Sequence, residues 1–180
     1  PGAAGRGGLG AVLGSKRLKA IVASGGENPN VAFPGELREF LRSEVGLVCE
    51  KAKPLTTFGT PVLVEMINQK GLLCTHNAAV ETFDSAAALG ADAMAPYIRR
   101  NTACPGCPIA CGKDVSVPGV NEAVTAKMPE YETIYALGSM LDMTSIEPVI
   151  RANALCDCLG LDMISMGVTL AFVAECLERG

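Results

Sequence analysis

The sequence predicts a mainly α-helical fold, preceded by a short glycine-rich loop and one strand. Apolar residues after residue 34 recur at the three- and four-residue spacing that buries one face of a helix. The run Lys19–Ala23 has the length and the apolar, β-branched content that predict a strand. Hydrophobic residues make up 49% of the 180 residues and charged residues 19%, so the composition excludes general disorder and allows a sizeable core.

The first 30 residues predict the end of one unit and the start of another. Residues 1–16 are rich in glycine and are expected to form a loop that leads into the strand. Glycine, proline and asparagine cluster again at residues 25–30, which makes this segment the best candidate for a domain boundary.

Proline and threonine mark the starts of the first two predicted helices. Pro34 suits a first helical position because it has no N–H to leave unpaired, and Leu37, Phe40 and Leu41 follow on one face. A second helix is expected from residues 60–61 onward. The remaining chain is expected to be irregular at 71–85, partly helical at 86–100, a loop at the clustered cysteines, and helical at 130–141, 145–159 and 163–179.

Charge and hydropathy exclude several classes of partner. The formal net charge is −4 and the basic residues are scattered, so we expect no nucleic-acid partner. There is no apolar run long enough for a membrane span and no secretion signal at the start, so we expect no membrane contact. The chain begins at Pro1 inside a glycine-rich run and stops after an apolar helical pattern. We therefore expect both ends to be cuts in a longer parent chain, whose missing parts would cover the surplus apolar surface.

The cysteines fall into two groups. Of the eight cysteines, Cys104, Cys107 and Cys111 form a C-x2-C-x3-C pattern in a segment rich in proline and glycine. Without a secretion signal we expect a reducing, cytoplasmic location, where clustered cysteines usually mean metal or redox chemistry. The other five are spread along apolar patterns, and we interpret them as small buried hydrophobes.

The spacing of the three clustered cysteines favours an iron–sulfur cluster. Thiolates two and three residues apart on a turn-rich loop can face one soft metal centre. An iron–sulfur cube and a structural zinc both need four ligands, and His76 is the one histidine in the sequence. A fourth cysteine outside this segment would complete a cluster, while zinc and purely structural cysteines remain as alternatives.

Three further motifs could bind a cofactor or could be plain structural features. The segment 156–162 predicts a helix that ends at Gly160 and another that begins with Asp162 as its N-cap, and its carboxylates could accept hydrogen bonds from a heterocycle. The glycines of 3–16 would let backbone N–H groups approach a phosphate. A dinucleotide-binding fingerprint also requires a strand before the glycines and a helix after them, and the sequence predicts neither. Glu130 and Glu132 are either helix-start charges or a catalytic carboxylate.

Five stretches keep a specific order and separation along the chain. The first is the glycine-rich stretch Gly5–Ile21. The other four are Thr75-His-Asn77, Ala103-Cys-Pro-Gly-Cys-Pro-Ile-Ala-Cys-Gly112, Pro129-Glu-Tyr-Glu-Thr133 and Asp157-Cys-Leu-Gly-Leu-Asp162. Together they resemble the tungsten-dependent aldehyde:ferredoxin oxidoreductase family. The resemblance covers essentially the whole sequence but only part of a family member's length.

The resemblance implies a domain arrangement and a set of cofactors. Residues 1–27 would be the C-terminal end of a β-rich domain that forms a base for the cofactor. Residues 30–180 would be most of a helical second domain of the aldehyde ferredoxin oxidoreductase type. The implied cofactors are a tungsten–bispterin (tungstopterin, of the molybdopterin kind), a magnesium ion that bridges the pterin phosphates, and a [4Fe–4S] cluster.

The family's metal ligands and its catalytic carboxylate can be carried over by motif. Cys104, Cys107 and Cys111 match three cluster ligands, and the fourth belongs to an Asp-x-x-Gly-Leu-Cys motif of a third domain that does not occur in this sequence. Glu132 matches the carboxylate near the metal, with Glu130 as the alternative because the register is not fixed.

The family's pterin contacts can be carried over in the same way. The motif that hydrogen-bonds one pterin is matched by Asp157, Gly160, Leu161 and Asp162, and the loop that meets the pterin phosphates and magnesium is matched by Ala4, Arg6 and Gly7. His76 departs from the arginine that relatives often have there. There is no Glu-x-x-His motif, so we expect no subunit-bridging metal, and a homo-oligomer remains open.

The activity implied by the resemblance is the oxidation of an aldehyde, with water, to a carboxylic acid. The two electrons would pass through the cluster to ferredoxin, which with the aldehyde and the rest of the parent chain makes up the expected partners. We expect this segment to be inactive alone. The alternatives are a tungsten reductase of the same family that acts on an aromatic or acyl thioester, and a noncatalytic iron–sulfur or zinc module.

Overall fold

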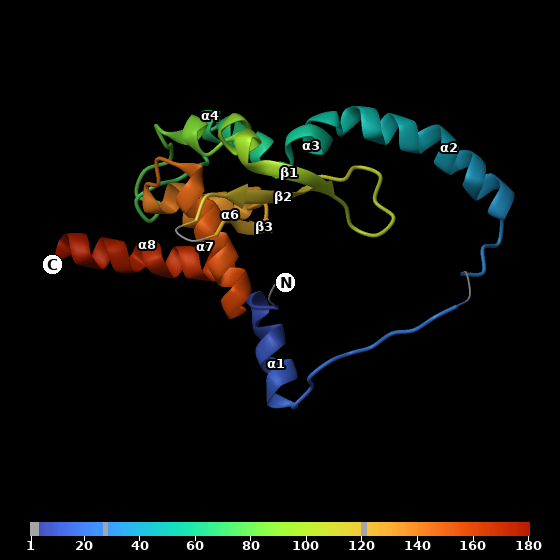
Figure 1. Ribbon diagram of the computed structural model, residues 1–180, viewed down its shortest axis with the longest axis horizontal. Coiled ribbons are helices and arrows are strands. Elements are labelled where there is room, and N and C mark those ends of the chain that lie inside the picture. The colour runs from blue at the N-terminus through green and yellow to red at the C-terminus, as the bar shows by residue number, and fades with distance from the viewer. Residues whose placement is uncertain (1–3, 27–28, 120–121) are drawn as a thin grey trace.

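Helices surround a small antiparallel sheet in the computed structural model, which describes residues 4–26, 29–119 and 122–180 (Figure 1). The prediction of a mainly helical fold is confirmed. The α-helices are α1 Leu9–Ser15, α2 Pro34–Lys51, α3 Lys53–Phe58, α4 Leu63–Gln69, α5 Ala91–Met94, α6 Tyr131–Leu137, α7 Ile146–Leu159 and α8 Met163–Arg179. Short 3-10 turns are η1 Arg6–Gly8, η2 Thr60–Val62, η3 Ala86–Ala88, η4 Ala95–Tyr97 and η5 Ser139–Leu141. The strands are β1 Ile98–Thr102, β2 Gly112–Val117 and β3 Val124–Lys127.

Most predicted helices form close to their expected limits. Pro34 occupies the first turn of α2, and Thr60 opens the η2 turn that runs directly into α4. The last three predicted helices correspond to α6 with η5, to α7 and to α8. Residues 71–85 are irregular apart from one isolated bridge between Thr75 and Val80, as expected.

The N-terminal expectations are wrong in detail. The glycine-rich segment forms η1 and α1 rather than a loop, so a short helix does follow the glycines. Residues 19–23 run as an extended stretch without strand pairing to any described residue (Figure 1). Ile21 and Val22 are 78% and 89% exposed, so this stretch has neither the ladder partner nor the buried face that stabilises a strand.

The sheet was not predicted from the sequence. Its strand order is β1-β2-β3 with both pairs antiparallel, and Thr102 pairs with Gly112 where the cysteine loop begins and ends. Buried and half-buried residues alternate along β2, which places Lys113, Val115 and Val117 on its inward face. A lysine on that face interrupts the apolar alternation that would have identified the strand.

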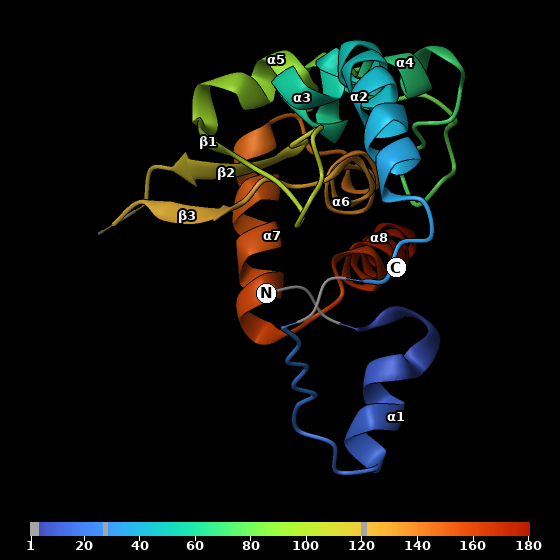
Figure 2. The same ribbon diagram turned by 90° about the vertical axis from the view of Figure 1, so that its right-hand side faces the viewer.

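The core lies between the sheet, the last three helices and the segment from α4 to α5. Figure 2 shows α7 crossing the sheet with α6 beside it, and α7 contacts both β2 and β3. Fully buried core side chains come from each layer and include Val64, Leu73, Phe83, Leu89, Met94, Val115, Val117, Ile134, Val149 and Ile150.

The predicted apolar face of α2 is present but uncovered. Leu37, Phe40 and Leu41 are 42%, 62% and 46% exposed, and α2 projects from the rest of the structure (Figure 1). Among the described helices, none is long and apolar enough by itself to cross a membrane. Helices α7 and α8 reach that length and hydropathy only as a pair, which is bent by 118°.

The cysteines outside the loop are only partly the buried hydrophobes that we expected. Cys156 is buried, and burial, with a smaller effect of nearby carboxylates, raises the pKa of its thiol. Cys49 and Cys74 are half-buried, while Cys158 and Cys176 are exposed. The interpretation is therefore wrong for the last two, because they lie on the outward sides of α7 and α8.

Helix α8 packs directly on α6 through a glycine. Gly167 is buried, and a Cβ atom at this position would lie 2.3 Å from the carbonyl oxygen of Ala136 in α6. The backbone at Gly167 and the Ala136 carbonyl are both held within helices, so neither can shift to make room for a side chain. The absence of a side chain at Gly167 therefore allows the two helices to approach.

We predict that Gly167→Ala lowers the free energy of unfolding by about 1–3 kcal/mol, because the new methyl group overpacks the α6–α8 contact. Gly14→Ala in α1 is the matched control, since no atom lies within 4 Å of the Cβ that this substitution adds. The control should gain up to about 1 kcal/mol of helix propensity or stay unchanged. Urea unfolding measures both, and equal stability of the two variants would contradict the prediction.

Candidate functional site

The three clustered cysteines lie on one irregular loop between β1 and β2. Cys104, Cys107 and Cys111 line a cavity of about 510 Å³. The Cys107 N–H donates to the Cys104 carbonyl at 3.0 Å, and Gly106 between them has φ +72°, which favours glycine. The sequence-based expectation of a turn-rich loop is confirmed.

The three cysteines share a cavity but do not form a site for a single metal ion. Within residues 4–26, 29–119 and 122–180, no three Cys, His, Asp or Glu side chains are grouped as ligands of one metal ion. The expectation that the three thiols converge on one centre is therefore not met for a single ion. An iron–sulfur cube takes its cysteine ligands on different irons. Three thiols around one cavity fit that donor set.

Lys113 lies behind the cysteine loop. Among the described residues it is the one charged side chain that is buried, and its Nζ donates to the carbonyls of Thr56, Ala110 and Cys111. Burial lowers the pKa of its ammonium group, and the nearby Cys111 and Glu130 offset part of that effect.

A second cavity, of about 440 Å³, adjoins the cysteine cavity. It is lined by five of the residues singled out in the sequence, Arg6, Glu130, Glu132, Asp157 and Asp162. They come from η1, from the start of α6, from the last turn of α7 and from the N-cap of α8. The fold thus brings together carboxylates that are separated by up to 32 positions and an arginine from the other end of the chain.

The turn between α7 and α8 has the predicted form. Gly160 ends α7 in the left-handed region at φ +68°, and the Leu161 N–H donates to the Cys156 carbonyl at 2.9 Å. Asp162 is the N-cap of α8, where its Oδ2 accepts from the N–H and the hydroxyl of Ser165 at 2.9 and 2.8 Å. These bonds hold the Asp162 carboxylate at the edge of the second cavity.

Arg6 joins the glycine-rich segment to this turn. Its Nε donates to Asp162 Oδ1 at 3.2 Å, and a Cβ atom at Gly5 would lie 2.4 Å from Asp162 Cβ. Ala4 and Gly7, also singled out, flank this contact, and the Ala4 carbonyl accepts from Gly10. The segment that was expected to meet phosphates therefore lies against the motif that was expected to meet a pterin.

Hydrogen bonds and charge stabilise the ionised form of Asp162. Burial is the largest single influence and raises the pKa of Asp162. The hydrogen bonds from Ser165 and the charge of Arg6 together outweigh it, so the pKa lies below its ordinary value of 3.8. Asp157, in contrast, accepts no side-chain hydrogen bond from the described residues, so its carboxylate is available to a ligand.

The two glutamates at the start of α6 differ in their contacts. Glu130 precedes the first turn, and its Oε2 accepts from the Thr60 hydroxyl, which itself accepts from the Tyr131 N–H at 2.9 Å. Glu132 lies in the first turn, is exposed, and has no hydrogen-bond partner among the described side chains. Burial, followed by the charge of Glu132, raises the pKa of Tyr131, which keeps that phenol protonated.

Two residues that the sequence did not single out, Lys127 and Met128, line both cavities together with Glu130. Asn153 of α7 lines the second cavity, is 3% exposed, and donates through Nδ2 to the Lys127 carbonyl at 3.0 Å. A polar residue at a core position of an apolar helix face was a signal that could have revealed Asn153.

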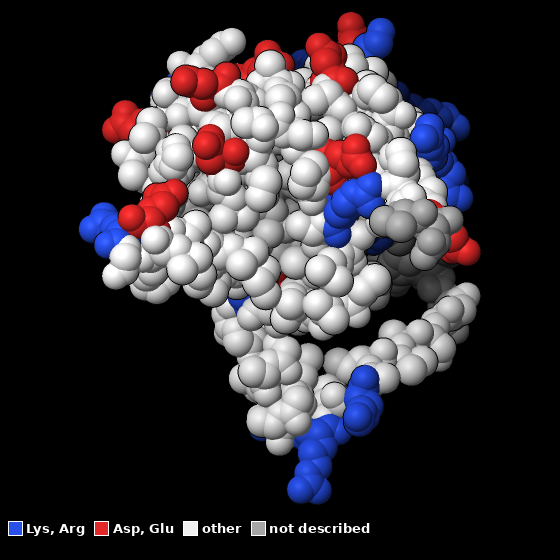
Figure 3. All heavy atoms as spheres, turned by 60° about the vertical axis from the view of Figure 1, so that its left-hand side comes forward, with Lys and Arg blue, Asp and Glu red and all other residues white. Residues whose placement is uncertain are grey.

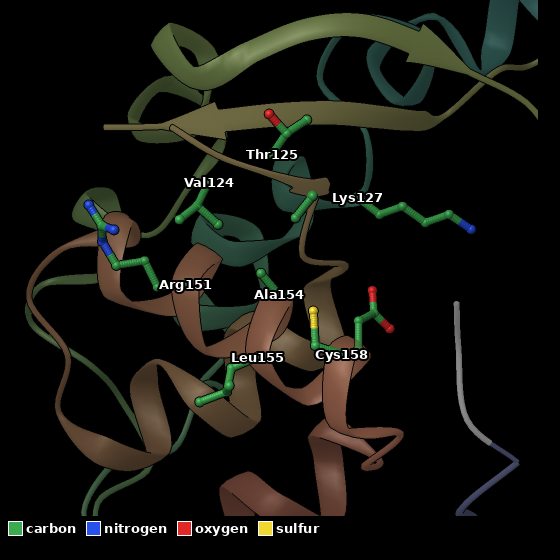
Figure 4. Close-up of a pocket in the computed structure, with 9 residues that line it drawn as sticks. Val124, Thr125, Lys127, Arg151, Ala154, Leu155 and Cys158 are labelled. Carbon is green, nitrogen blue, oxygen red and sulfur yellow. The ribbon is translucent and has the colours of Figure 1, made fainter. Parts of the chain in front are cut away.

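A third cavity, of about 550 Å³, lies between β3 and α7 (Figure 4). Val124, Ala154 and Leu155 give it a largely apolar lining, and it shares Lys127 with both other cavities. The run of basic residues at positions 16–19 lies elsewhere, at the exposed end of α1, where Figure 3 shows blue side chains at the lower tip.

The fold and the site define a mainly helical domain in which a cysteine-lined cavity adjoins an acid-lined one. A sequence profile described as aldehyde ferredoxin oxidoreductase, domains 2 & 3, matches residues 46–180. The chain therefore belongs to the aldehyde ferredoxin oxidoreductase family, which confirms the resemblance drawn from its motifs.

Individual relatives match over 99% of the chain. The tungsten-containing aldehyde ferredoxin oxidoreductases of Pyrococcus abyssi and Pyrococcus horikoshii are 42% and 41% identical to it over 186 residues. A more distant relative, 31% identical over 194 residues, is the WOR-like subunit of the aliphatic sulfonate oxidoreductase of Pyrococcus furiosus, of which the match covers 29%. The chain spans about 30% of the length of the first two relatives.

We predict that the charge of Asp162 stabilises the fold at neutral pH and not in acid. Because its pKa is lowered by folding, the contribution is complete above the ordinary value of 3.8 and is lost as pH falls through the lower folded value. Wild type should therefore be about 0.5–1 kcal/mol more stable than Asp162→Asn near pH 7, and the two should become equal at the acid end. Urea unfolding as a function of pH measures this.

The control for that measurement is Asp84→Asn. Asp84 is exposed and has no hydrogen bond to the described residues. Its substitution should leave stability unchanged across the pH range. A difference between wild type and Asp162→Asn that does not depend on pH would contradict the role given to the charge.

Proposed function

We propose that the full-length protein that contains this chain oxidises aldehydes to carboxylic acids at a tungsten–bispterin centre and passes the electrons through a [4Fe–4S] cluster to ferredoxin. The observation that carries the proposal is the pair of adjoining cavities, which share Lys127, Met128 and Glu130. One cavity offers thiols and the other offers carboxylates. The names of the two Pyrococcus aldehyde ferredoxin oxidoreductases support the tungsten, the aldehyde and the ferredoxin.

In this proposal the cysteine cavity holds the iron–sulfur cluster. Cys104, Cys107 and Cys111 would each bind one iron, and a fourth ligand would come from the remainder of the protein. All three lie on one loop whose ends are paired at Thr102 and Gly112, so the thiols are held near each other before any metal binds. A zinc ion is less well supported, because the three cysteines are not grouped as ligands of one metal ion among the described residues.

The acid-lined cavity would hold one pterin. The free carboxylate of Asp157 can accept hydrogen bonds from the N–H groups of a heterocycle, while Asp162 is already engaged by Ser165 and Arg6 and would mainly orient the turn. Gly160 and Leu161 do not line this cavity themselves, and they would shape the turn that carries the two carboxylates.

The glycine-rich segment would meet the phosphate end of the pterin. Ala4, Arg6 and Gly7 would lie close to the phosphates and the bridging magnesium ion. The Arg6 side chain is 65% exposed, and nothing lies within 4 Å of a Cβ position at Gly7, so a ligand could approach its backbone closely. Both features fit an anionic ligand.

Residues 1–27 would then complete the base domain and residues 30–180 would form most of the helical domain. The remaining domains of the protein would cover the apolar side chains of α2, of which Phe40 is 62% exposed. We therefore propose that the isolated segment is inactive, since it supplies only part of each cofactor site.

The chain's own contribution to the chemistry would be to position the aldehyde and to move a proton. When bound, the metal centre and the cluster supply two-electron oxidation and one-electron transfer. Glu132 is the better candidate for the catalytic base because its carboxylate has no described partner, whereas that of Glu130 accepts a hydrogen bond from Thr60. A free carboxylate can take the proton released when water adds to the aldehyde carbon.

Two other functions remain in view. The sulfonate oxidoreductase subunit among the relatives supports a different substrate on the same scaffold, as would an aromatic or acyl thioester in a tungsten reductase. The second alternative function is a noncatalytic metal-binding module. The tungsten content of the purified full-length protein separates the module, which would hold none, from the enzymes.

We predict that the full-length, tungsten-loaded protein reduces a viologen dye in the presence of an aldehyde and forms the carboxylic acid. Glu132→Gln should lower kcat about 10²- to 10⁴-fold by removing the base. Glu130→Gln is the matched control, and should lose no more than about tenfold because it chiefly loses a hydrogen bond. Dye reduction, product analysis and tungsten content are measured on the same samples.

The results distinguish the proposals. A tungsten-loaded wild type that is inert with aldehydes but active with a thioester or a sulfonate would favour the other substrates. Full activity in Glu132→Gln, together with a large loss in Glu130→Gln, would assign the base to Glu130 instead.

A further inference from the structure

The backbone of the cysteine loop is anchored through its carbonyl groups. The four consecutive carbonyls of residues 108–111 each accept a hydrogen bond from a side chain of the surrounding protein. Cys49 of α2 and Thr56 of α3 donate to the first two, at 3.9 Å from Sγ and 2.7 Å from Oγ1. Lys113 of β2 donates to the other two, at 3.2 and 3.4 Å from Nζ. Three elements therefore hold one side of the loop.

Lys113 is placed to act as a cation in this arrangement. Its Nζ also donates to the Thr56 carbonyl at 2.8 Å, so three carbonyl oxygens occupy the three N–H bonds of an ammonium group. No carboxylate of the described residues forms an ion pair with it. The side chain is 1% exposed and lies on the inward face of β2 with Val115 and Val117. A buried charge is costly unless it is compensated, and here the three carbonyl oxygens supply the hydrogen bonds.

The anchored carbonyls determine where the N–H groups of the loop point. There is no cis peptide bond in the described residues, and in a trans peptide the C=O and the following N–H point in opposite directions. Since the carbonyls of residues 108–111 face α2, α3 and Lys113, the N–H groups that follow them face the other way. Those of Ile109, Ala110 and Cys111 find no acceptor among the described residues. Ala110 has φ +52°, and left-handed residues of this kind occur in the backbone concavities that bind anions.

We infer that Lys113, assisted by Thr56, is a positioning residue for the iron–sulfur cluster, an inference that rests on the function proposed above. It holds the loop carbonyls against the protein, which leaves the N–H groups of residues 109–111 as donors to the cluster sulfurs, and it places an unpaired positive charge behind them. Both effects stabilise the reduced cluster, which carries one more negative charge than the oxidised one. Both therefore raise the reduction potential.

The test compares variants of the full-length protein that differ in these contacts. Lys113→Met removes the cation and its hydrogen bonds, and Lys53→Met is its control on the exposed start of α3. Thr56→Val removes the hydroxyl that binds the Ile109 carbonyl, and Thr57→Val is its control, since the Thr57 hydroxyl donates only to Lys53 within the helix. The readouts are iron content and the cluster's reduction potential, followed by electron paramagnetic resonance.

We predict that Lys113→Met lowers the equilibrium constant for one-electron reduction of the cluster about tenfold. This corresponds to a fall in reduction potential of about 59 mV. Thr56→Val should lower the potential by less, and both controls should match wild type. A wild-type potential in a cluster-containing Lys113→Met protein would overturn the inference. If Lys113→Met does not fold or holds no cluster, the reduction potential of Thr56→Val is the test. A wild-type potential in Thr56→Val would then overturn the inference as well.

A failure of the proposed function would look different. Wild-type protein without iron, or without the resonance signal of a reduced [4Fe–4S] cluster, would remove the cluster itself. Wild-type protein with a cluster whose potential ignores Lys113 and Thr56 would leave the proposed function intact and remove only the role given to these two residues.

Discussion

The close packing of α8 on α6 is the constraint on which the acid-lined cavity depends. Gly167 lets α8 lie against Ala136 near the end of α6, and residues from the starts of both helices line the acid-lined cavity. Glu130 and Glu132 are at the start of one helix and Asp162 is the N-cap of the other, so their carboxylates face a common space. Both helix N-termini carry partial positive charge, which offsets part of the repulsion among these groups.

Local signals account for the parts of the fold that the sequence predicted. Helices α7 and α8 were placed accurately because Gly160 and Asp162 mark the turn between them through their own backbone and side-chain chemistry. The sheet was missed because β2 is buried by α7, an element that lies later in the chain, and because Lys113 occupies its inward face. The predicted strand at 19–23 failed for the opposite reason, since its apolar residues have no partner in the described chain.

The candidate site shows the same division. The motif residues Arg6, Asp157 and Asp162 were singled out from the sequence, and they line one cavity. Thr60 and Lys127 were not singled out as site residues, because only the tertiary fold brings η2 and the end of β3 next to α6. Their residue types are ordinary for exposed turns and strand ends, so no sequence pattern distinguishes them.

The cysteine loop is also a hairpin loop, and that topology bears on the order in which the two halves of the site form during folding. Its three thiols lie within eight positions, between strands that pair directly at Thr102 and Gly112, so gathering them closes only a short loop and costs little chain entropy. The acid-lined cavity needs Arg6 to meet Asp162 across 156 positions. Long-range contacts of this kind form late. Local strand pairing thus suffices to gather the thiols, whereas the carboxylates meet only when the two ends of the chain are brought together.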